Sequence, residues 1–389
     1  MSTAPSDEMV VDPTADTPTE PVKTPAPRLA SLDALRGFDM FWIVGGGTLA
    51  TALSGYVAWP WLDWVVEHLE HKKWDGFAYY DLIFPLFLFI AGVAMPFSLT
   101  RRLEDGERKR RLYVRVFRRA ALLVLLGFIY NGLLRFDWET MRYPSVLGRI
   151  GLAYLFAALI VLRFGVISQF IWLVVILLGY WAAMTLIPVP GHGAGVLTME
   201  GSLAGYVDRA VLPGRLYKEV HDPEGLLSTI PAIGTALLGA LAGALLRARR
   251  PGPILTTIIL AAAGWACLEI GELWNLTFPI NKNLWTSSFA LVAGGRSLLL
   301  LAGFYFVIDV CRLEFLVFPF IVIGMNPITI YLCAHGLIDF QHTTQALFGG
   351  ALEHYAQEPL RPVLWALSVL LVEWLFLFFL YRKKVFLRV

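Results

Sequence analysis

Apolar segments long enough to cross a lipid bilayer recur along the whole of this chain, and they constrain its fold more than any other feature. A transmembrane helix needs about 20 predominantly apolar residues, and 57% of the 389 residues are hydrophobic. Because backbone polar groups must be satisfied within the bilayer, we expect an all-α polytopic membrane protein. Apolar windows predict ten helical spans, at 36–56, 79–99, 114–134, 146–164, 166–187, 226–246, 253–273, 286–308, 315–336 and 361–381.

Lys and Arg residues gather in the connections on one side of these spans. The basic runs are RRLEDGERKRR at 101–111, RARR at 247–250 and YRKK at 381–384. The positive-inside rule assigns this side, with both chain termini, to the cytoplasm. We therefore expect a multi-pass protein of the cell inner membrane whose partner is the lipid bilayer, with no nucleic acid.

The first 27 residues are rich in Pro, Thr, Asp and Glu and contain no apolar core of a signal peptide. This composition predicts a disordered cytoplasmic tail at 1–27. The three cysteines, Cys267, Cys311 and Cys333, lie in or beside predicted spans. Their spacing indicates neither a disulfide framework nor a metal site.

The segment from Trp59 to Trp74 lies between the first two predicted spans and is too short and too charged to cross the membrane. Its tryptophans are typical of a helix that lies in the membrane interface. Anchoring of this segment at the membrane interface is sufficient to explain these tryptophans. We therefore expect an interfacial helix between the first two spans.

Several ionisable residues fall within the predicted spans, where each costs about 2.5–3.5 kcal/mol on insertion scales. Such residues face a cavity, pair with one another or carry function. Arg296 and Glu373 have similar depths, so an interhelical ion pair is favoured over a role in a substrate pathway. Asp81, Arg149 and Glu272 map near the outer ends of their helices, at a depth that a loop residue such as His71 can reach.

His71 is attractive because the pKa of a histidine, near 6.5, allows it to accept a proton at neutral pH. Asp81 opens the following span and serves either as a partner or as a helix cap. Spacing alone does not choose among the histidines, and no HExxH pattern is present. The competing histidines are His68, His192, His221, His335, His342 and His354.

The loop from Phe278 to Phe289 gathers polar groups around Trp285, at the outer mouth of the eighth span. This density is typical of a sugar-binding loop and equally of a solvated loop. The segment from Ser228 to Gly243 is rich in small residues, which favour close packing of helices.

Five motifs, taken together and in order, resemble the transmembrane glucosamine N-acetyltransferase family in a bacterial-type form. They are RLASLDALRGFDMF at 28–41, HKKWDGFAYYDLIFPLFLFIAG at 71–92, VLGRIGLAY at 146–154, NKNLWTSSF at 281–289 and GMNPITIY at 324–331. The resemblance implies that 28–389 is a ten-span transmembrane acetyltransferase domain, and it makes a homodimer plausible. Two positions depart from the family pattern. Gly47 stands where the family has an asparagine, and Gly148 stands where a glutamine is common in the family.

The resemblance implies transfer of acetyl from cytosolic acetyl-CoA, as co-substrate, to the amine of a glucosamine-containing acceptor outside. His71 matches the family's active-site histidine and acts either as general base or as acetyl acceptor. Asp81 is its expected catalytic partner, and Asn283, Asn326 or Arg149 would stabilise the oxyanion. The full set of expected substrate-binding residues is Trp74, Arg149, Glu272, Asn281, Lys282, Asn283, Trp285 and Asn326.

The phosphates of CoA call for basic residues on the cytoplasmic side, with the pantetheine arm reaching into the bundle. Ordinary positive-inside topology is the alternative explanation of the same residues. The expected CoA-binding residues are Arg28, Arg36, Arg101, Arg102, Arg118 and Arg119.

Two other functions fit the same pattern. Ten spans with intramembrane charges also suit a secondary transporter for an amino sugar or muropeptide. An O-acyltransferase of a surface polysaccharide shares the architecture and differs in its acceptor.

Overall fold

The computed structural model describes residues 29–248 and 251–387. Within these ranges the regular structure is helical throughout, with three isolated β-bridges in the loops, so the expected all-α fold is confirmed. The predicted tail at 1–27 and the expected phosphate ligand Arg28 lie outside the described residues.

Seven helical segments among the described residues are long and apolar enough to cross a membrane, which supports a multi-pass membrane protein. They are Tyr79–Glu104, α7 (Val146–Arg163), α8 (Val166–Leu186), α10 (Thr229–Arg247), α11 (Pro253–Asn275), Ser287–Val310 and α17 (Leu360–Arg382). The first of these contains η2 (Tyr79–Leu82), α4 (Ile83–Met95), η3 (Pro96–Thr100) and α5 (Arg101–Glu104), and the sixth contains α12 (Ser287–Tyr305) and η5 (Phe306–Val310). Each of the seven segments coincides with one of the predicted spans.

The other three predicted spans do not form long apolar helices, so the count of ten is not confirmed. The first is interrupted at Gly45, between α1 (Ala30–Phe41), η1 (Trp42–Gly46) and α2 (Gly47–Tyr56). The third is α6 (Lys109–Tyr130), whose first half is rich in Lys and Arg. The ninth is divided at Asn326 and Pro327 between α13 (Phe318–Gly324) and α14 (Pro327–Leu332), where proline removes a backbone donor.

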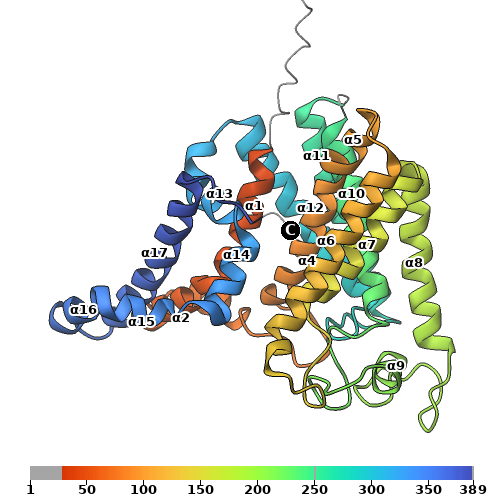
Figure 1. Ribbon diagram of the computed structural model, residues 1–389, viewed down its shortest axis with the longest axis horizontal. Helices are drawn as coiled ribbons and strands as arrows, with labels where there is room; N and C mark the ends of the chain where they lie inside the picture. The colour runs from red at the N-terminus through yellow and green to blue at the C-terminus, as the bar shows by residue number, and fades with distance from the viewer. Residues whose placement is uncertain (1–28, 249–250, 388–389) are drawn as a thin grey trace, which may run out of the picture.

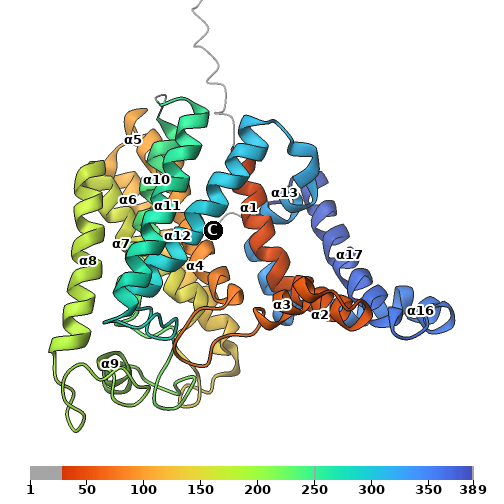
Figure 2. The ribbon, with the colours of Figure 1, turned by 180° about the vertical axis from the view of Figure 1, so that it is seen from behind.

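The helices form two groups joined through α1 (Figures 1 and 2). The larger is a bundle in which α10 packs on α4, α7 and α8, while α6 packs on α7 and α11 on α12. The smaller contains α2, α13, α14, α17 and the short helices α15 (Phe340–Thr344) and α16 (Gly350–Tyr355). Helix α1 contacts α12 and α4 in the larger group and α13 in the smaller.

Close approach of helices in the bundle depends on small residues, as the sequence of 228–243 predicts. A Cβ atom added to Gly239 in α10 would lie 2.1 Å from the carbonyl oxygen of Phe89 in α4. In the reverse direction, a Cβ on Gly92 would lie 2.0 Å from the carbonyl oxygen of Ala236. The backbones of α4 and α10 are therefore in direct contact, and neither position has room for a side chain.

The two ends of the bundle differ in composition. One end, here called the basic face, carries the start of α1, α5 (Arg101–Glu104) and the C-terminal end of α10 (Figure 1). The other, here called the opposite face, carries the loops around α9 (Leu203–Val211) and the 276–286 loop. His71 lies there as well, because its Nδ1 atom is 3.1 Å from Nζ of Lys282 in that loop. The short helix α3 (Pro60–Glu67) exposes Trp61 and Trp64 near this face, and its interfacial position remains a prediction.

Candidate functional site

A histidine and a buried carboxylate form a pair at the opposite face, where the first residues of the Tyr79–Glu104 span begin. The Nδ1 atom of His71 lies 2.6 Å from Oδ1 of Asp81. The side chain of His71 is 51% exposed, whereas that of Asp81 is 1% exposed. Since an ionised carboxylate only accepts hydrogen bonds, the proton of His71 lies on Nδ1 and Nε2 is left as a base.

The local fold fixes Asp81 in this position. Asp81 lies in the 3₁₀ turn η2 (Tyr79–Leu82), where its Oδ2 accepts a hydrogen bond of 3.0 Å from the backbone N–H of Ala78. The carboxylate therefore caps the helix start and holds His71 at the same time. Asp81 therefore takes both positions that the sequence left open, as hydrogen-bond partner of His71 and as helix cap.

Lys282 completes the cluster from the loop between α11 and α12. Its Nζ atom lies 3.2 Å from Oδ1 of Asp81 and 3.1 Å from Nδ1 of His71. Burial lowers the pKa of Lys282 below its usual value, although the Asp81 carboxylate opposes this shift. The neighbouring Asn281 anchors the loop, because its side-chain amide donates to Asp75 at 3.1 Å.

His71 and Lys282 line a cavity of about 230 Å³ that extends into the bundle. Its wall also includes Tyr80, Glu224 and Tyr331. The remaining lining is apolar and comes from α1, η1, α4, α7 and α14. We call this space the His71 cavity.

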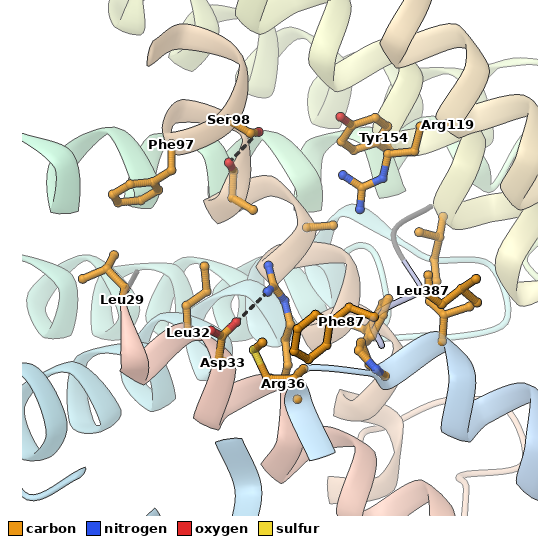
Figure 3. A pocket seen from close by; sticks show the side chains of 18 of the residues that line it. Leu29, Leu32, Asp33, Arg36, Phe87, Phe97, Ser98, Arg119, Tyr154 and Leu387 are labelled. Atoms are coloured by element: carbon orange, nitrogen blue, oxygen red, sulfur yellow. Dashed lines mark hydrogen bonds and ion pairs between the residues drawn. The ribbon is translucent and has the colours of Figure 1, made fainter. Parts of the chain in front are cut away.

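A second cavity, of about 450 Å³, lies near the basic face (Figure 3). Arg36 of α1 and Arg119 of α6 point into it from opposite walls, and Arg101 lines it as well. Arg36 is paired with Asp33 at 3.0 Å. The buried Nε atom of Arg119 has no hydrogen-bond partner in the described part of the chain. We call this space the arginine cavity.

The two cavities adjoin inside the bundle. The same four side chains, those of Phe87, Ile150, Pro327 and Ile328, line both of them. Tyr80 lines one cavity and Arg101 lines the other, and these two residues lie near opposite ends of the same span. At 1.5 Å per residue, this separation is about 30 Å, the thickness of the hydrocarbon core.

The other expected substrate residues lie elsewhere or support the loops. Three of them are structural. Trp74 donates to the carbonyl of Leu197 at 3.0 Å, and the fully buried Trp285 donates to Thr235 at 3.2 Å. Asn283 donates weakly to the carbonyl of Lys73 at 3.4 Å. None of these three lines the His71 cavity.

For three of the expected site residues, depth along the helix did not predict where the side chain lies. Glu272 is exposed on α11 and does not line the His71 cavity. Arg149 is buried beneath the cavity lining, where its guanidinium hydrogen-bonds Ser228 and stacks on Trp285, with 5.0 Å between the guanidinium carbon and the ring centroid. Asn326 binds the C-terminal segment through the carbonyl of Val385 at 3.1 Å, so it supports the arginine cavity.

Among the expected CoA ligands, Arg36, Arg101 and Arg119 meet in the arginine cavity, and two others do not. Arg102 pairs with Glu107 at 3.5 Å, and Arg118 lines a separate surface groove along α6.

The expected ion pair between Arg296 and Glu373 is wrong. The guanidinium carbon of Arg296 lies 3.8 Å from the ring centroid of Phe77, whereas Glu373 of α17 lines a different cavity together with residues of η1, α2 and α15.

Reasoning from the sequence missed Glu224 and the cluster that holds it. Asp222 accepts two hydrogen bonds from Arg142, of 2.7 and 2.6 Å, and Glu224 accepts a third. Burial alone would lower the pKa of Arg142, but the two carboxylates raise it above its usual value. The signal available in the sequence was the Asp-Pro-Glu-Gly turn immediately before an apolar span.

The fold and these cavities define a multi-pass helical membrane protein with a His–Asp–Lys cluster at one internal cavity and arginines at an adjoining one. A family model described as a domain of unknown function (DUF5009) matches residues 28–136. The chain is 29% identical to heparan-alpha-glucosaminide N-acetyltransferase of Homo sapiens, over 92% of this chain and 60% of the human protein. It is 28% identical to the Mus musculus protein of the same name, over 96% of this chain and 62% of that protein.

These two proteins are homologues of the chain over nearly its whole length, which is the relationship that the five motifs indicate. The chain spans about three fifths of the length of the curated relatives it matches. Both relatives are named as N-acetyltransferases that act on a glucosaminide.

Proposed function

We propose that this protein transfers an acetyl group from acetyl-CoA, bound at the basic face, to the amine of a glucosamine-containing acceptor at the opposite face. One observation carries the proposal: the arginine cavity and the His71 cavity adjoin through four shared side chains. The names of the two relatives support the acetyl group and the amino-sugar class. The positive-inside rule assigns the basic face to the cytoplasm.

The arginine cavity fits the phosphates of CoA. Arg36, Arg101 and Arg119 line it, and Arg119 has an unsatisfied buried donor. Charge-assisted hydrogen bonds to phosphate are the strong form of this interaction. The pantetheine arm is about half a bilayer long, so it would extend past Phe87 and Ile150 toward His71.

His71 supplies the reactive nitrogen. In the direct route, Nε2 takes a proton from the acceptor's ammonium group, and the neutral amine then attacks the thioester carbonyl, forming the C–N bond as the C–S bond breaks. CoA leaves as a thiolate, which takes up the proton that the attacking nitrogen loses. In the covalent route, Nε2 itself attacks the thioester and expels CoA as a thiolate, which takes a proton from the ammonium group, and the acetyl group then passes from the imidazole to the neutral amine. In both routes Asp81 holds the Nδ1 proton and stabilises positive charge on the ring.

The test is acetyl transfer by purified protein in vesicles, with acetyl-CoA on one side only and glucosamine on the other. We expect an amide product and a loss of turnover of about 10²-fold or more in His71→Ala. The exposed His342 on α15 provides the matched control, because His342→Ala should leave turnover unchanged. Undiminished turnover in His71→Ala would contradict the assigned site.

The same assay separates the other functions. An ester product would identify an O-acyltransferase, and uptake of unmodified sugar without acetyl-CoA would identify a transporter. A brief pulse of radiolabelled acetyl-CoA without acceptor distinguishes the two routes, because only the covalent route labels the protein at His71.

A further inference from the structure

We propose that Glu224 binds the ammonium group of the incoming acceptor and makes the His71 cavity selective for amino sugars over neutral sugars. This inference rests on the proposed function and adds a specificity-determining residue to it. Glu224 lies in the turn that precedes α10, about 150 residues from His71 along the chain, and the fold brings both to one cavity.

The position of Glu224 permits contact with a ligand. Its side chain is 12% exposed, and it lines the His71 cavity together with Lys282. Oε2 faces Arg142, whereas Oε1 has no hydrogen-bond partner within 29–248 and 251–387. One carboxylate oxygen is therefore available to a group that enters the cavity.

The carboxylate of Glu224 can accept a hydrogen bond from a cationic group at that oxygen. Asp222 and Glu224 share the guanidinium of Arg142, and Arg149 and Lys282 also interact electrostatically with Glu224. The ammonium of Lys282 is already occupied by Asp81. Arg149 is a further cation nearby, but it is buried outside the cavity lining and hydrogen-bonds the hydroxyl of Ser228.

A purely structural role for Glu224 is the competing explanation. Arg142 donates two hydrogen bonds to Asp222, and Asp222 is itself fixed by the backbone N–H groups of Tyr217 and Glu224, both at 3.0 Å. The Glu224 carboxylate is therefore the additional partner of a guanidinium that is already bound. Gln at this position retains an oxygen for Arg142 and removes only the charge.

The chemistry of the reaction requires that a bound ammonium lose its proton before attack. Glu224 would hold the acceptor as an ammonium ion, and Nε2 of His71, in the same cavity, would take the proton. A hydroxyl group in place of the amine would form only a neutral-donor bond to the carboxylate, which is roughly half as strong as the charge-assisted one. The cavity would thus favour amines.

The experiment compares Glu224→Gln with wild type in the acetyl-transfer assay, using glucosamine at varied concentration. We expect the KM for glucosamine to rise about tenfold or more, since one charge-assisted bond is lost, while the KM for acetyl-CoA stays unchanged. Glu200→Gln is the matched control, because Glu200 is an exposed glutamate on the same face. Glu224→Asp, which keeps the charge on a shorter side chain, should give an intermediate KM.

A second readout does not depend on catalysis. Calorimetric titration of the protein without acetyl-CoA should detect glucosamine but not glucose, and Glu224→Gln should remove this preference. Equal KM values for glucosamine in wild type and in folded Glu224→Gln would overturn the inference. Absence of acetyl transfer by wild type would instead contradict the proposed function, so the two failures are distinguishable.

Discussion

The imidazole of His71 donates a 2.6 Å hydrogen bond to the carboxylate of Asp81, which is buried although His71 is half exposed. The pair therefore joins a solvent-accessible base to a partner that solvent does not reach. The carboxylate fixes the tautomer and the orientation of the ring. In the proposed reaction, Nε2 would therefore be the nitrogen that accepts a proton or the acetyl group.

Asp81→Asn should lower the turnover of acetyl transfer by about 10²-fold. The substitution removes the negative charge that stabilises a positively charged His71 and leaves Lys282 without its partner carboxylate. Steady-state kinetics measure the effect, with little change expected in the KM for acetyl-CoA, because Asp81 is remote from the arginine cavity. Turnover close to wild type would show that the pair is structural.

Arg119→Gln and Arg36→Gln should each raise the KM for acetyl-CoA about tenfold, since each removes a charge-assisted contact to phosphate. The rise in KM that these two substitutions cause should be smaller when the co-substrate is an acetylated pantetheine that lacks the nucleotide. Arg110 lies in the surface groove of α6, so Arg110→Gln is the control for loss of charge alone. Equal effects of all three substitutions would argue against a phosphate site in the arginine cavity.

Gly92→Ala should prevent normal folding, because its Cβ would lie 2.0 Å from the carbonyl oxygen of Ala236 and force α4 and α10 apart. Gly179 in α8 has nothing within 4 Å of such a Cβ. Gly179→Ala should therefore be neutral or slightly stabilising, since alanine favours a helix by about 1 kcal/mol over glycine. Size-exclusion chromatography and thermal unfolding in detergent compare the two variants. Equal behaviour would contradict direct backbone contact.

Two buried groups at the opposite face, Asp208 and His221, should make opposite contributions to the pH dependence of stability. Burial raises the pKa of Asp208 to about 7, so the folded chain binds an extra proton there between about pH 4 and 7. The contribution of Asp208 to stability is thus lost as the pH rises through this window. Burial lowers the pKa of His221 to about 4, so its contribution is lost as the pH falls from 6.5 to 4.

In wild type these two contributions oppose each other over much of the same window. Relative to wild type, Asp208→Asn should therefore make stability increase with pH, and His221→Phe should make it decrease, each by up to about 1.4 kcal/mol per pH unit. Hydrogen exchange of the backbone of α9, which carries Asp208, measures the local effect. Slopes of the same sign in both variants would contradict the burial of one group or the other.

Most of the helices could be predicted from the sequence. Seven of the predicted spans recur as long apolar helices, because length and hydrophobicity are local properties of a segment. The remaining three show where local reasoning fails. A window average does not register the break at Gly45, the divided helix around Asn326 or the basic half of α6.

The sequence by itself determined the all-helical architecture and the motifs that carry the resemblance. Asp81 lies ten residues from His71, and a helix start commonly holds an acid close to the preceding loop, so this pair was accessible to sequence reasoning. The tertiary structure alone decided that Lys282 and Glu224 join His71, and that Glu272 and Asn326 do not. The physical reason is that depth in a membrane follows from position along a helix, whereas the direction of a side chain depends on which neighbouring helix it packs against.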